Sequence, residues 1–471
     1  MSAARNSQVV KQLRDSGVRF LELVFLDIQG TPRSKTIPID RVDHVLEVNG
    51  TWTDGSSIRG LTRQHESDIW LRLDLPDDPK EWSRRVFIET WGDAETKTAI
   101  ILTDVCSADG ELFLLSPRSA HKVFAERVEK ERGFYLQAGW EPEFYLLKPE
   151  DEGWRIAPHD SGGYYSLGPI DRADTIRKTI MARAMEFGVP TDASHHEVGA
   201  GQHEIEPRYT KAIDAADRFW LFKHVVRSVA FEKFGLMATF MPKPFADRPG
   251  NGSHVHLSIA ARDGRNLFYD PDDRRGYKLS KLAYHFVAGL VHHAPALVAV
   301  ICPTVNSYKR HDPAFEAPTD IVWARTHRGA FIRIPACQAG EVEKGARVEL
   351  RAPDPTCNPH ITLLSVLACG LDGIERELDA GDPFNEDVHH LSAEVRAKRA
   401  IRQLPRHVGE ATDHLEKDEV LKKAMGDALF QALLASNRAQ WQEYCDKVPR
   451  EEREGPTKRV STWELETYLH I

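Results

Sequence analysis

Residues 139–147 read GWEPEFYLL, a run of bulky apolar side chains that carries two glutamates. Glu141 and Glu143 are two positions apart, so an extended chain turns both carboxylates to the same face. The apolar residues that follow, among them Phe144 and Leu146, favour a strand. The stretch therefore predicts a β-strand with one acidic face.

Two segments farther along the chain repeat this period of two. In GNGSHVHLSI, His254 and His256 share a face, while the apolar residues between and after them point the other way. In ARVELRAPDP, Arg347, Glu349 and Arg351 alternate with a valine and a leucine. Both segments therefore predict strands with a polar face and an apolar face.

A fourth segment, SHHEVGAGQHEIEPRY, places Glu197 and Glu204 on either side of a glycine-rich bend. Carboxylates gathered with an imidazole suit Mg²⁺ or Mn²⁺, which prefer oxygen ligands. Interleaved arginines indicate phosphate clamps, because the guanidinium fork matches phosphate oxygens. Each pattern alone is more often a solvated strand face, a satisfied histidine pair or a surface salt-bridge ladder. Spacing by itself supports a metal-dependent enzyme that acts on an anion.

The first hundred residues predict a small domain rich in strands. Val9, Val10 and Leu13 give one apolar face to a short helix that ends at Gly17. The following VRFLELVFLDIQG, with the extended stretch after its turn, predicts a hairpin. Further strand-like runs continue to about residue 106, so we place the first domain at residues 1–110.

Residues 111–471 predict one large domain that mixes strands and helices. SPRSAHKVFAERVEKERG has a serine cap at Ser116, an early proline and a terminal glycine, which together predict a helix. The stretch from about Leu391 to Lys447 is charged and poor in turn residues, so we expect it to be helical. Because strands and helices do not alternate regularly, the pattern favours an α+β fold over a doubly wound sheet.

The composition is that of a soluble globular protein. The 471 residues are 41% hydrophobic and 28% charged with a net charge of −9, which argues against nucleic acid or an anionic membrane as partner. Six scattered cysteines without a CxxC pair indicate a reducing compartment. The N-terminus lacks an apolar leader, and histidines and prolines interrupt the apolar segment 287–305. We therefore expect a cytoplasmic protein.

These segments, in this order, resemble class I glutamine synthetase of bacteria and archaea along nearly the whole chain. The resemblance implies a small N-terminal β-grasp domain and a large catalytic domain, whose antiparallel sheet forms a funnel-shaped site with flanking helices. The motifs that carry it are DGSSIRG at 54–60, EPEF at 141–144, HHEVGAGQHE at 195–204, FMPKPF at 240–245, GNGSHVHLS at 250–258, TVNSYKR at 304–310, FEAP at 315–318, HRGAFIRIP at 327–335 and RVELRAPDP at 347–355.

The resemblance also implies roles for individual residues. It assigns two or more Mg²⁺ or Mn²⁺ ions to each site, and ATP as co-substrate. The residues that match the family's positions are Glu143, Glu197 and Glu204 for one metal; Glu141, His254 and Glu349 for the second; His256, Ser258 and Lys344 for the nucleotide; Arg328, Arg333 and Arg347 for the transferring phosphate; and Gly250, Arg310 and Arg351 for glutamate.

The implied reaction joins ammonia to the γ-carboxylate of glutamate through γ-glutamyl phosphate. Asp54, Tyr164 and Glu197 match an ammonium pocket, in which Asp54 would take a proton from ammonium. Glu316 matches a flap residue that closes over the intermediate and takes the last proton. The family's assembly is a dodecamer of two hexameric rings, in which the N-terminal domain contributes residues to the neighbouring subunit's site.

Three segments depart from the family pattern. The usual NRS reads His327-Arg328-Gly329, which keeps the arginine but alters its neighbours. Pro249 stands where an asparagine would meet the glutamate amino group, and proline has no side-chain donor or acceptor. Arg402, in AIRQLP, stands where some members carry a modifiable tyrosine, so we predict no adenylylation there. Two alternatives remain: a γ-glutamyl ligase for a polyamine, ethanolamine or methylamine, and a family member that has lost catalysis. The complete set of metal-site matches argues against the second alternative.

Overall fold

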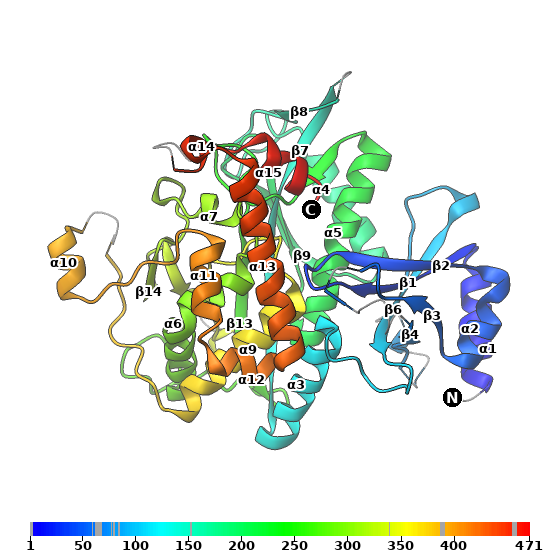
Figure 1. The fold of residues 1–471 in the computed structure, drawn as a ribbon, viewed down its shortest axis with the longest axis horizontal. Helices are drawn as coiled ribbons and strands as arrows, with labels where there is room; N and C mark the ends of the chain where they lie inside the picture. Colours follow the sequence, from blue (N-terminus) through cyan, green and yellow to red (C-terminus); the bar gives the residue numbers. More distant parts are fainter. Residues whose placement is uncertain are drawn as a thin grey trace.

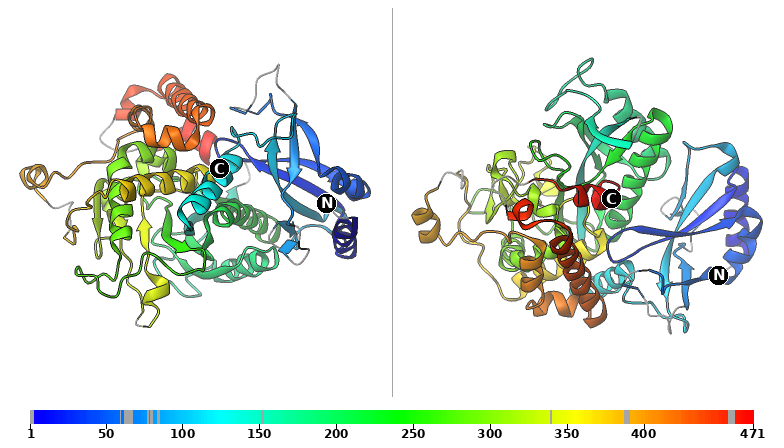
Figure 2. Two further views of the ribbon diagram at one scale, coloured as in Figure 1. Left: turned by 90° about the horizontal axis from the view of Figure 1, so that it is seen from below. Right: turned by 45° about the horizontal axis from the view of Figure 1, so that its top comes forward.

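The computed structural model describes residues 3–58, 60–61, 68–76, 78, 81–82, 85–150, 153–338, 340–386, 391–454 and 459–471. Two sheets organise these residues, and the smaller sheet lies at the right of Figure 1 with the N-terminus. The larger sheet lies at the centre among most of the helices. Helix α10 projects from the side opposite the small sheet in Figures 1 and 2.

The small sheet has six strands within the described residues, in the order β2-β1-β6-β4-β3 with β5 paired to β6. Strands β1 and β2 form the predicted antiparallel hairpin, whereas β1 and β6 run parallel. Val9 and Leu13 of α1 are buried in one cluster with Leu21 and Ile101 of the sheet, so the predicted opening helix is confirmed. The elements are α1 (Ala3–Asp15), β1 (Phe20–Leu26), β2 (Pro32–Pro38), η1 (Ile39–Arg41), α2 (Val42–Val48), β3 (Gly50–Asp54), β4 (Asp68–Leu73), β5 (Val86–Ile88), η4 (Ala94–Thr96) and β6 (Thr98–Cys106).

The large sheet has ten strands within the described residues, with a main order of β14-β15-β16-β13-β7-β10-β9. The predicted strand at residues 139–147 lies inside β7, which also pairs with β8, β11 and β12. Among the described pairs of this sheet, β14–β15 alone is parallel. The strands are β7 (Phe134–Glu150), β8 (Gly153–Pro158), β9 (Thr191–His196), β10 (Gln202–Pro207), β11 (Thr210–Lys211), β12 (Met237–Thr239), β13 (Ser253–Ala261), β14 (Asp320–Ala324), β15 (Ala330–Arg333) and β16 (Val348–Leu350).

Helices surround the large sheet and dominate the C-terminal third, as predicted (Figure 1). The predicted helix after Ser116 is α3, and it ends at Gly133 in the left-handed conformation. The expected side-chain cap is not made, because the Ser116 hydroxyl is buried without a hydrogen bond. The helices are α3 (Pro117–Arg132), α4 (Asp174–Glu186), α5 (Ala212–Phe234), α6 (Lys281–Ile301), α7 (Ser307–Arg310), η5 (Pro313–Phe315), α8 (Val342–Gly345), α9 (Pro359–Glu375), α10 (Ala393–Lys398), α11 (Val408–Leu415), α12 (Glu419–Met425), α13 (Asp427–Lys447), α14 (Arg450–Glu454) and α15 (Thr462–Tyr468).

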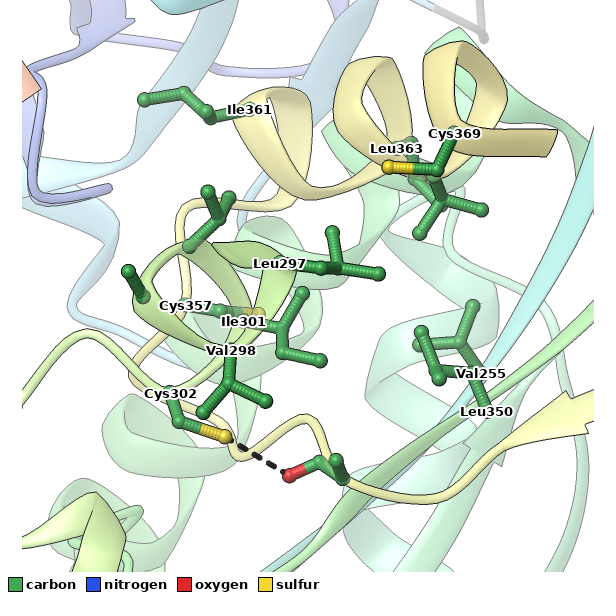
Figure 3. Close-up of a cluster of buried hydrophobic side chains, with 14 of the residues drawn as sticks. Val255, Leu297, Val298, Ile301, Cys302, Leu350, Cys357, Ile361, Leu363 and Cys369 are labelled. Atoms are coloured by element: carbon green, nitrogen blue, oxygen red, sulfur yellow. Dashed lines mark hydrogen bonds between the residues drawn. The ribbon is translucent and has the colours of Figure 1, made fainter. Parts of the chain in front are cut away.

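The apolar face of the large sheet packs on α6 and α9. Figure 3 shows Val255 of β13 and Leu350 of β16 pointing toward Leu297 and Ile301 of α6 and Leu363 of α9. Each such side chain contributes roughly 1.5–3 kcal/mol when it leaves water. A slip of one residue would carry a histidine or a glutamate into this core, so burial fixes the strand register.

Helix α6 is long and apolar enough to span a membrane by length and composition, but 72% of its most apolar segment is buried inside the protein. Such burial is that of a core helix. Cys302, which follows α6, donates from Sγ to the Ala352 carbonyl oxygen at 3.1 Å (Figure 3). This contact ties the end of α6 to the segment that follows β16.

Two buried polar contacts fix the small sheet against the rest of the chain. The Asn358 side chain accepts from the amides of His360 and Ile361 at the start of α9, and its Nδ2 donates to the Asp27 carbonyl at 2.9 Å. Arg118 of α3 pairs with Asp104 of β6 at 2.6 Å and with Asp217 of α5 at 2.8 Å. These contacts join β1, β6, α3, α5 and α9 into one body.

Candidate active site

A cavity of about 600 Å³ lies on the polar face of the large sheet. Carboxylates outnumber guanidinium groups by three among the described residues that line it, so cations or protons must offset part of the negative charge. The lining glutamates are Glu141, Glu143, Glu197, Glu204, Glu206, Glu316 and Glu349, and the lining arginines are Arg310, Arg328, Arg333 and Arg351.

Strand register brings these side chains together from distant parts of the sequence. Glu204 of β10 lies opposite Glu143 of β7, and Glu141 lies opposite His254 of β13. Glu349 of β16 lies opposite both His256 and Arg333. Cross-strand partners have Cβ atoms about 4.5–5.5 Å apart, so the rows form one continuous polar surface.

The first group of acidic residues comprises Glu143, Glu197 and Glu204, with His195 between two of them. His195 Nε2 lies 2.8 Å from a Glu197 carboxylate oxygen, and its Nδ1 lies 3.8 Å from Glu204. One Glu143 oxygen accepts from the Gly252 amide at 2.8 Å and from the Gln202 side chain at 3.1 Å. The potential ligand atoms of His195, Glu197 and Glu204 lie within 4.8 Å of one another. Glu143 lines the same cavity and lies opposite Glu204.

Burial and mutual repulsion oppose the ionisation of this group. Burial and the nearby Glu197 raise the pKa of Glu143 to about 7. Burial, Glu141 and Glu143 raise the pKa of Glu204 well above its ordinary value. A divalent cation would relieve this repulsion, and carboxylate oxygens are the ligands that Mg²⁺ and Mn²⁺ prefer. The donor set therefore fits such an ion.

The second group comprises Glu141, His256 and Glu349, whose potential ligand atoms lie within 4.8 Å of one another. His256 Nε2 lies 2.6 Å from a Glu141 oxygen, while Arg347 Nε donates to His256 Nδ1 at 3.0 Å. Because a guanidinium can only donate, the proton of this imidazole is on Nε2. The predicted set for the second metal has His254 in place of His256, whose protonated Nε2 has no lone pair for a metal.

His254 lies instead between the two groups. Its Nε2 is 3.5 Å from a Glu143 oxygen, and its Nδ1 is 3.1 Å from the Arg351 carbonyl oxygen. Burial and the neighbouring Arg351 hold the pKa of His254 well below its usual range, so its ring is neutral. A neutral imidazole with Nδ1 donating to a carbonyl has its Nε2 lone pair free for a metal.

Arginines surround Glu349, which is 1% exposed. Arg333 donates to it at 2.6 Å and Arg351 contacts its other oxygen. Burial alone would raise the pKa of Glu349, but the charges of Arg351 and Arg333 hold it well below its ordinary value. Arg310 donates to the Ala352 and Arg351 carbonyls at 2.8 and 3.1 Å.

Gly252 lies where three of these groups meet. A Cβ at this position would be 2.6 Å from an Arg310 nitrogen and 3.1 Å from a Glu143 oxygen. Only glycine leaves the Arg310 guanidinium and the Glu143 carboxylate in place, which explains why glycine stands at position 252 of the GNGSH segment.

Tyr164, Glu316 and Arg328 lie together at the cavity mouth. Burial lowers the pKa of Arg328, but Tyr164 and Glu316 outweigh burial and raise it. Glu316 follows η5 in the left-handed conformation, with φ of 55°. Tyr165 stacks on His195 with ring centroids 4.7 Å apart, so aromatic side chains border the first acidic group.

Several predicted site residues do not line the cavity. Asp54 ends β3 in the small sheet, where its carboxylate accepts from the Ser56 amide at 2.7 Å. Ser258 lies farther along β13 and accepts from the Tyr209 hydroxyl at 2.7 Å. Lys344 is exposed in α8, and Arg347 donates to His256 Nδ1 and to the Gly345 carbonyl oxygen. Arg59 of the DGSSIRG motif lies outside the described residues.

Four polar residues of the cavity were not singled out by the sequence analysis: His195, Gln202, Glu206 and Tyr165. Gln202 and Glu206 alternate with Glu204 along β10, so the period of two that identified other positions would have found them. Tyr165 has φ of 56°, and its position depends on a loop that no periodicity describes.

Fold and cavity together define a protein with candidate metal-binding groups and arginines in one cavity. Two models of glutamine synthetase match the chain: the β-grasp domain over residues 17–108 and the catalytic domain over residues 114–456. The chain belongs to the glutamine synthetase family, whose members are ATP-dependent ligases that use divalent metal. The predicted α+β fold with an N-terminal β-grasp domain is confirmed.

Known relatives span the full chain. The glutamine synthetase of Pyrococcus woesei is 39% identical over 458 residues, covering 97% of this chain and 98% of its own. That of Thermus thermophilus is 38% identical over 473 residues, covering 98% of both chains. A solved structure described as a GmaS/ADP complex superposes with a TM-score of 0.80 at 32% identity, covering 98% of this chain and 99% of its own.

Proposed function

We propose that the chain joins ammonia to the γ-carboxylate of L-glutamate at the expense of ATP, giving glutamine, ADP and phosphate. One observation carries the proposal: a cavity with excess carboxylates, two imidazoles and four arginines in a member of this ligase family. A γ-carboxylate oxygen would attack the γ-phosphorus of ATP, and ADP would leave. Ammonia would then attack the acyl phosphate carbon, and phosphate would leave with the loss of one ammonium proton.

Two divalent ions, Mg²⁺ or Mn²⁺, fit the acidic groups. Glu143, Glu197 and Glu204 would hold one ion, and Glu141, Glu349 and a histidine the second. When bound, such ions would neutralise part of the negative charge on the phosphoryl groups. The free Nε2 of His254 supports its predicted role as the histidine ligand of the second ion. His256 would orient Glu141 through their hydrogen bond and contact the nucleotide.

The remaining polar residues would bind substrates and disperse charge. Arg328, Arg333 and Arg347 would neutralise the transferring phosphoryl group, and Lys344 and Ser258 would contact the nucleotide. Arg310, Arg351 and the Gly250 backbone would hold glutamate. The buried carbonyl contacts of Arg310 support this role, because they keep the guanidinium pre-oriented in the cavity.

A complete site would need two copies of the chain. Tyr164 and Glu197 border the cavity, whereas Asp54 is exposed on the small sheet of the same chain. We therefore propose that Asp54 enters the cavity of a neighbouring subunit, where it would deprotonate ammonium, and that Glu316 closes the flap. The assembly would be a dodecamer of two hexameric rings, located in the cytoplasm, with residues 1–110 and 111–471 as its domains.

Mixing two inactive variants tests the shared site. Asp54→Ala and Glu316→Gln subunits, dissociated and reassembled in equal amounts, should recover about a quarter of wild-type activity, because random pairing restores that share of interfaces. Either variant reassembled alone is the control and should stay inactive. If fully reassembled mixtures recovered no activity, both residues would have to come from the same subunit, and the shared site would be refuted.

The second candidate is a ligase that uses methylamine in place of ammonia. It is favoured by the likeness to GmaS, a γ-glutamylmethylamide synthetase, and by Pro249 at the substrate loop. Phosphate release from ATP with glutamate and Mg²⁺ separates the two when ammonium, methylamine, ethanolamine and polyamines are compared. Strong stimulation by ammonium alone, lost in Asp54→Ala, supports glutamine synthesis, whereas turnover with methylamine and little with ammonium refutes it.

A further inference from the structure

A buried cluster of polar side chains lies directly behind the bend that carries Glu197. The side chains of Asp160 and His196 are both 0% exposed, and His196 Nε2 lies 3.0 Å from an Asp160 oxygen. The other ring nitrogen of His196, Nδ1, lies 2.6 Å from the Glu197 carbonyl oxygen. One imidazole thus joins an aspartate from the connection after β8 to the main chain of a cavity glutamate.

His203 lies beside this pair, and the three residues have the composition of a metal site. Their potential ligand atoms lie within 4.8 Å of one another. Arg177, however, has a nitrogen 3.0 Å from His203 Nδ1. Because a guanidinium only donates, Nδ1 must accept, and the proton of His203 is on Nε2. A protonated nitrogen cannot bind a metal, so the cluster is better described as a hydrogen-bond network.

The unpaired atoms of the cluster support this description. His203 Nε2 and the second Asp160 oxygen are both buried without a partner among the described residues. One is a donor and the other an acceptor, so a small shift or one bridging water would satisfy both. Asp171 neutralises Arg177 at 2.6 Å, which leaves the far end of the network with its charges balanced.

We propose that His196 is a positioning residue that aims the Glu197 carboxylate into the cavity, with Asp160 holding His196 in place. The inference rests on the proposed metal-binding role of Glu197. Its peptide is fixed at both ends, because its N–H donates to the Gln202 carbonyl at 2.8 Å and its carbonyl accepts from His196. Asp160 also accepts from the Gly201 amide at 2.8 Å, so it holds both ends of the bend.

The loop after β8 packs closely against the His196 ring. A Cβ at position 162 would lie 2.5 Å from His196 Nε2, so only glycine fits at this point of the loop after β8. Outer hydrogen-bond partners of a metal site typically change metal affinity about 10- to 100-fold when they are lost. The structure assigns this kind of effect to the contact between His196 and the Glu197 carbonyl.

Two isosteric substitutions separate the two bonds of His196. In His196→Asn the amide nitrogen replaces Nδ1, which keeps the bond to Glu197 and loses Asp160. In His196→Gln the amide nitrogen replaces Nε2, which keeps Asp160 and loses the Glu197 carbonyl. Mn²⁺ binding to the assembled full-length protein, measured by electron paramagnetic resonance, should weaken about 10- to 100-fold in His196→Gln and only a few-fold in His196→Asn.

Controls distinguish positioning from general damage. Asp171→Asn alters the far end of the network, so it should lower the melting temperature without changing Mn²⁺ affinity. If His196→Gln does not assemble, Gly162→Ala displaces the same imidazole and carries the same expectation. The inference would be overturned if His196→Gln bound Mn²⁺ as tightly as the wild type. It would also be overturned if Asp171→Asn, at a melting temperature matched to that of His196→Gln, weakened Mn²⁺ binding by the same factor.

Two further measurements identify how the inference could fail. Glu197→Gln should itself weaken Mn²⁺ binding, and wild-type affinity in this variant would refute both the proposed metal role and the inference. Metal analysis of EDTA-treated His203→Gln should equal that of the wild type. Loss of one tightly held zinc equivalent in this variant would show that the cluster binds metal and would overturn the positioning role.

Discussion

Replacing Glu143 and Glu349 by glutamine should change the stability of the metal-free protein in opposite directions. The chemical change is identical, and both residues are buried at the cavity, with 9% and 1% of their surface exposed. Glu143 is surrounded by other carboxylates, whereas Glu349 contacts two arginines. Glu143→Gln therefore removes repulsion, and Glu349→Gln removes attraction.

The magnitude for Glu143 follows from its pKa, which rises from 4.5 to about 7 in the folded protein. Each unit corresponds to about 1.4 kcal/mol, so ionised Glu143 costs on the order of 3 kcal/mol above pH 7. The folded state holds this proton more tightly than the unfolded state, so stability falls as the pH rises from 4.5 through 7. Glu143→Gln should gain about 3 kcal/mol at pH 8 and under about 1 kcal/mol at pH 5.

The ionised form of Glu349 stabilises the folded protein, which is the opposite of the effect of Glu143. Its folded pKa is depressed, so its contribution is present above its ordinary pKa of 4.5 and is lost only as the pH falls through the folded value. Removing one partner of a buried ion pair costs on the order of 3 kcal/mol. Glu349→Gln should lose that amount at both pH 5 and pH 8.

Thermal melts of the EDTA-treated variants at pH 5 and pH 8 measure both effects. A gain for Glu143→Gln that is the same at the two pH values would refute the repulsion argument. A stabilised Glu349→Gln would refute the ion-pair argument. With Mn²⁺ added, both variants should lose ligase activity, because each substitution removes a proposed metal ligand.

Three further expectations concern other parts of the protein. Removing divalent ions with EDTA should lower the melting temperature. Mn²⁺ at about 100 times its dissociation constant should restore about 2.7 kcal/mol of folding free energy per site, which calorimetry would measure. An unchanged melting temperature would contradict a metal site in the folded state. Gly252→Ala should abolish most activity, because its Cβ would meet a guanidinium nitrogen at 2.6 Å, whereas Gly92→Ala, with its nearest atom at 3.5 Å, should retain it. Burial lowers the pKa of His293, but its bonds to Asp418 and Asp372 raise it overall, so its stabilisation is present below about pH 6.5 and is lost as the pH rises through the folded value. His293→Gln should therefore lower the melting temperature more at pH 6 than at pH 9, and an equal loss at both would contradict the paired charge.

Local patterns predicted the strands and the polar face of the sheet well. The period of two around Glu141, His254 and Glu349 depends only on backbone geometry, so the sequence contains it directly. The hairpin near the N-terminus and helix α3 were equally accessible, because turn glycines and apolar spacing mark them. Family resemblance supplied the roles that spacing could not.

Contacts between distant segments were beyond local patterns. Whether His254 or His256 contacts Glu141 depends on side-chain rotamers and on Arg347, which lies 91 residues away from His256. The distance between Asp54 and the cavity depends on how the small sheet docks, and no residue in β3 signals it. The buried Asp160 behind Glu197 is equally invisible, because a single aspartate in a loop has no periodic context.

The register of β7, β13 and β16 also has a consequence for folding. The strands that carry Glu141, His254 and Glu349 come from residues 134–150, 253–261 and 348–350, so every pairing between them closes a loop of about a hundred residues. Contacts between such distant residues form slowly, because loop closure must precede them. Refolding should therefore restore helical circular dichroism well before it restores metal binding. A truncated chain that ends before residue 348 would lack one strand of the site, however well its other strands formed.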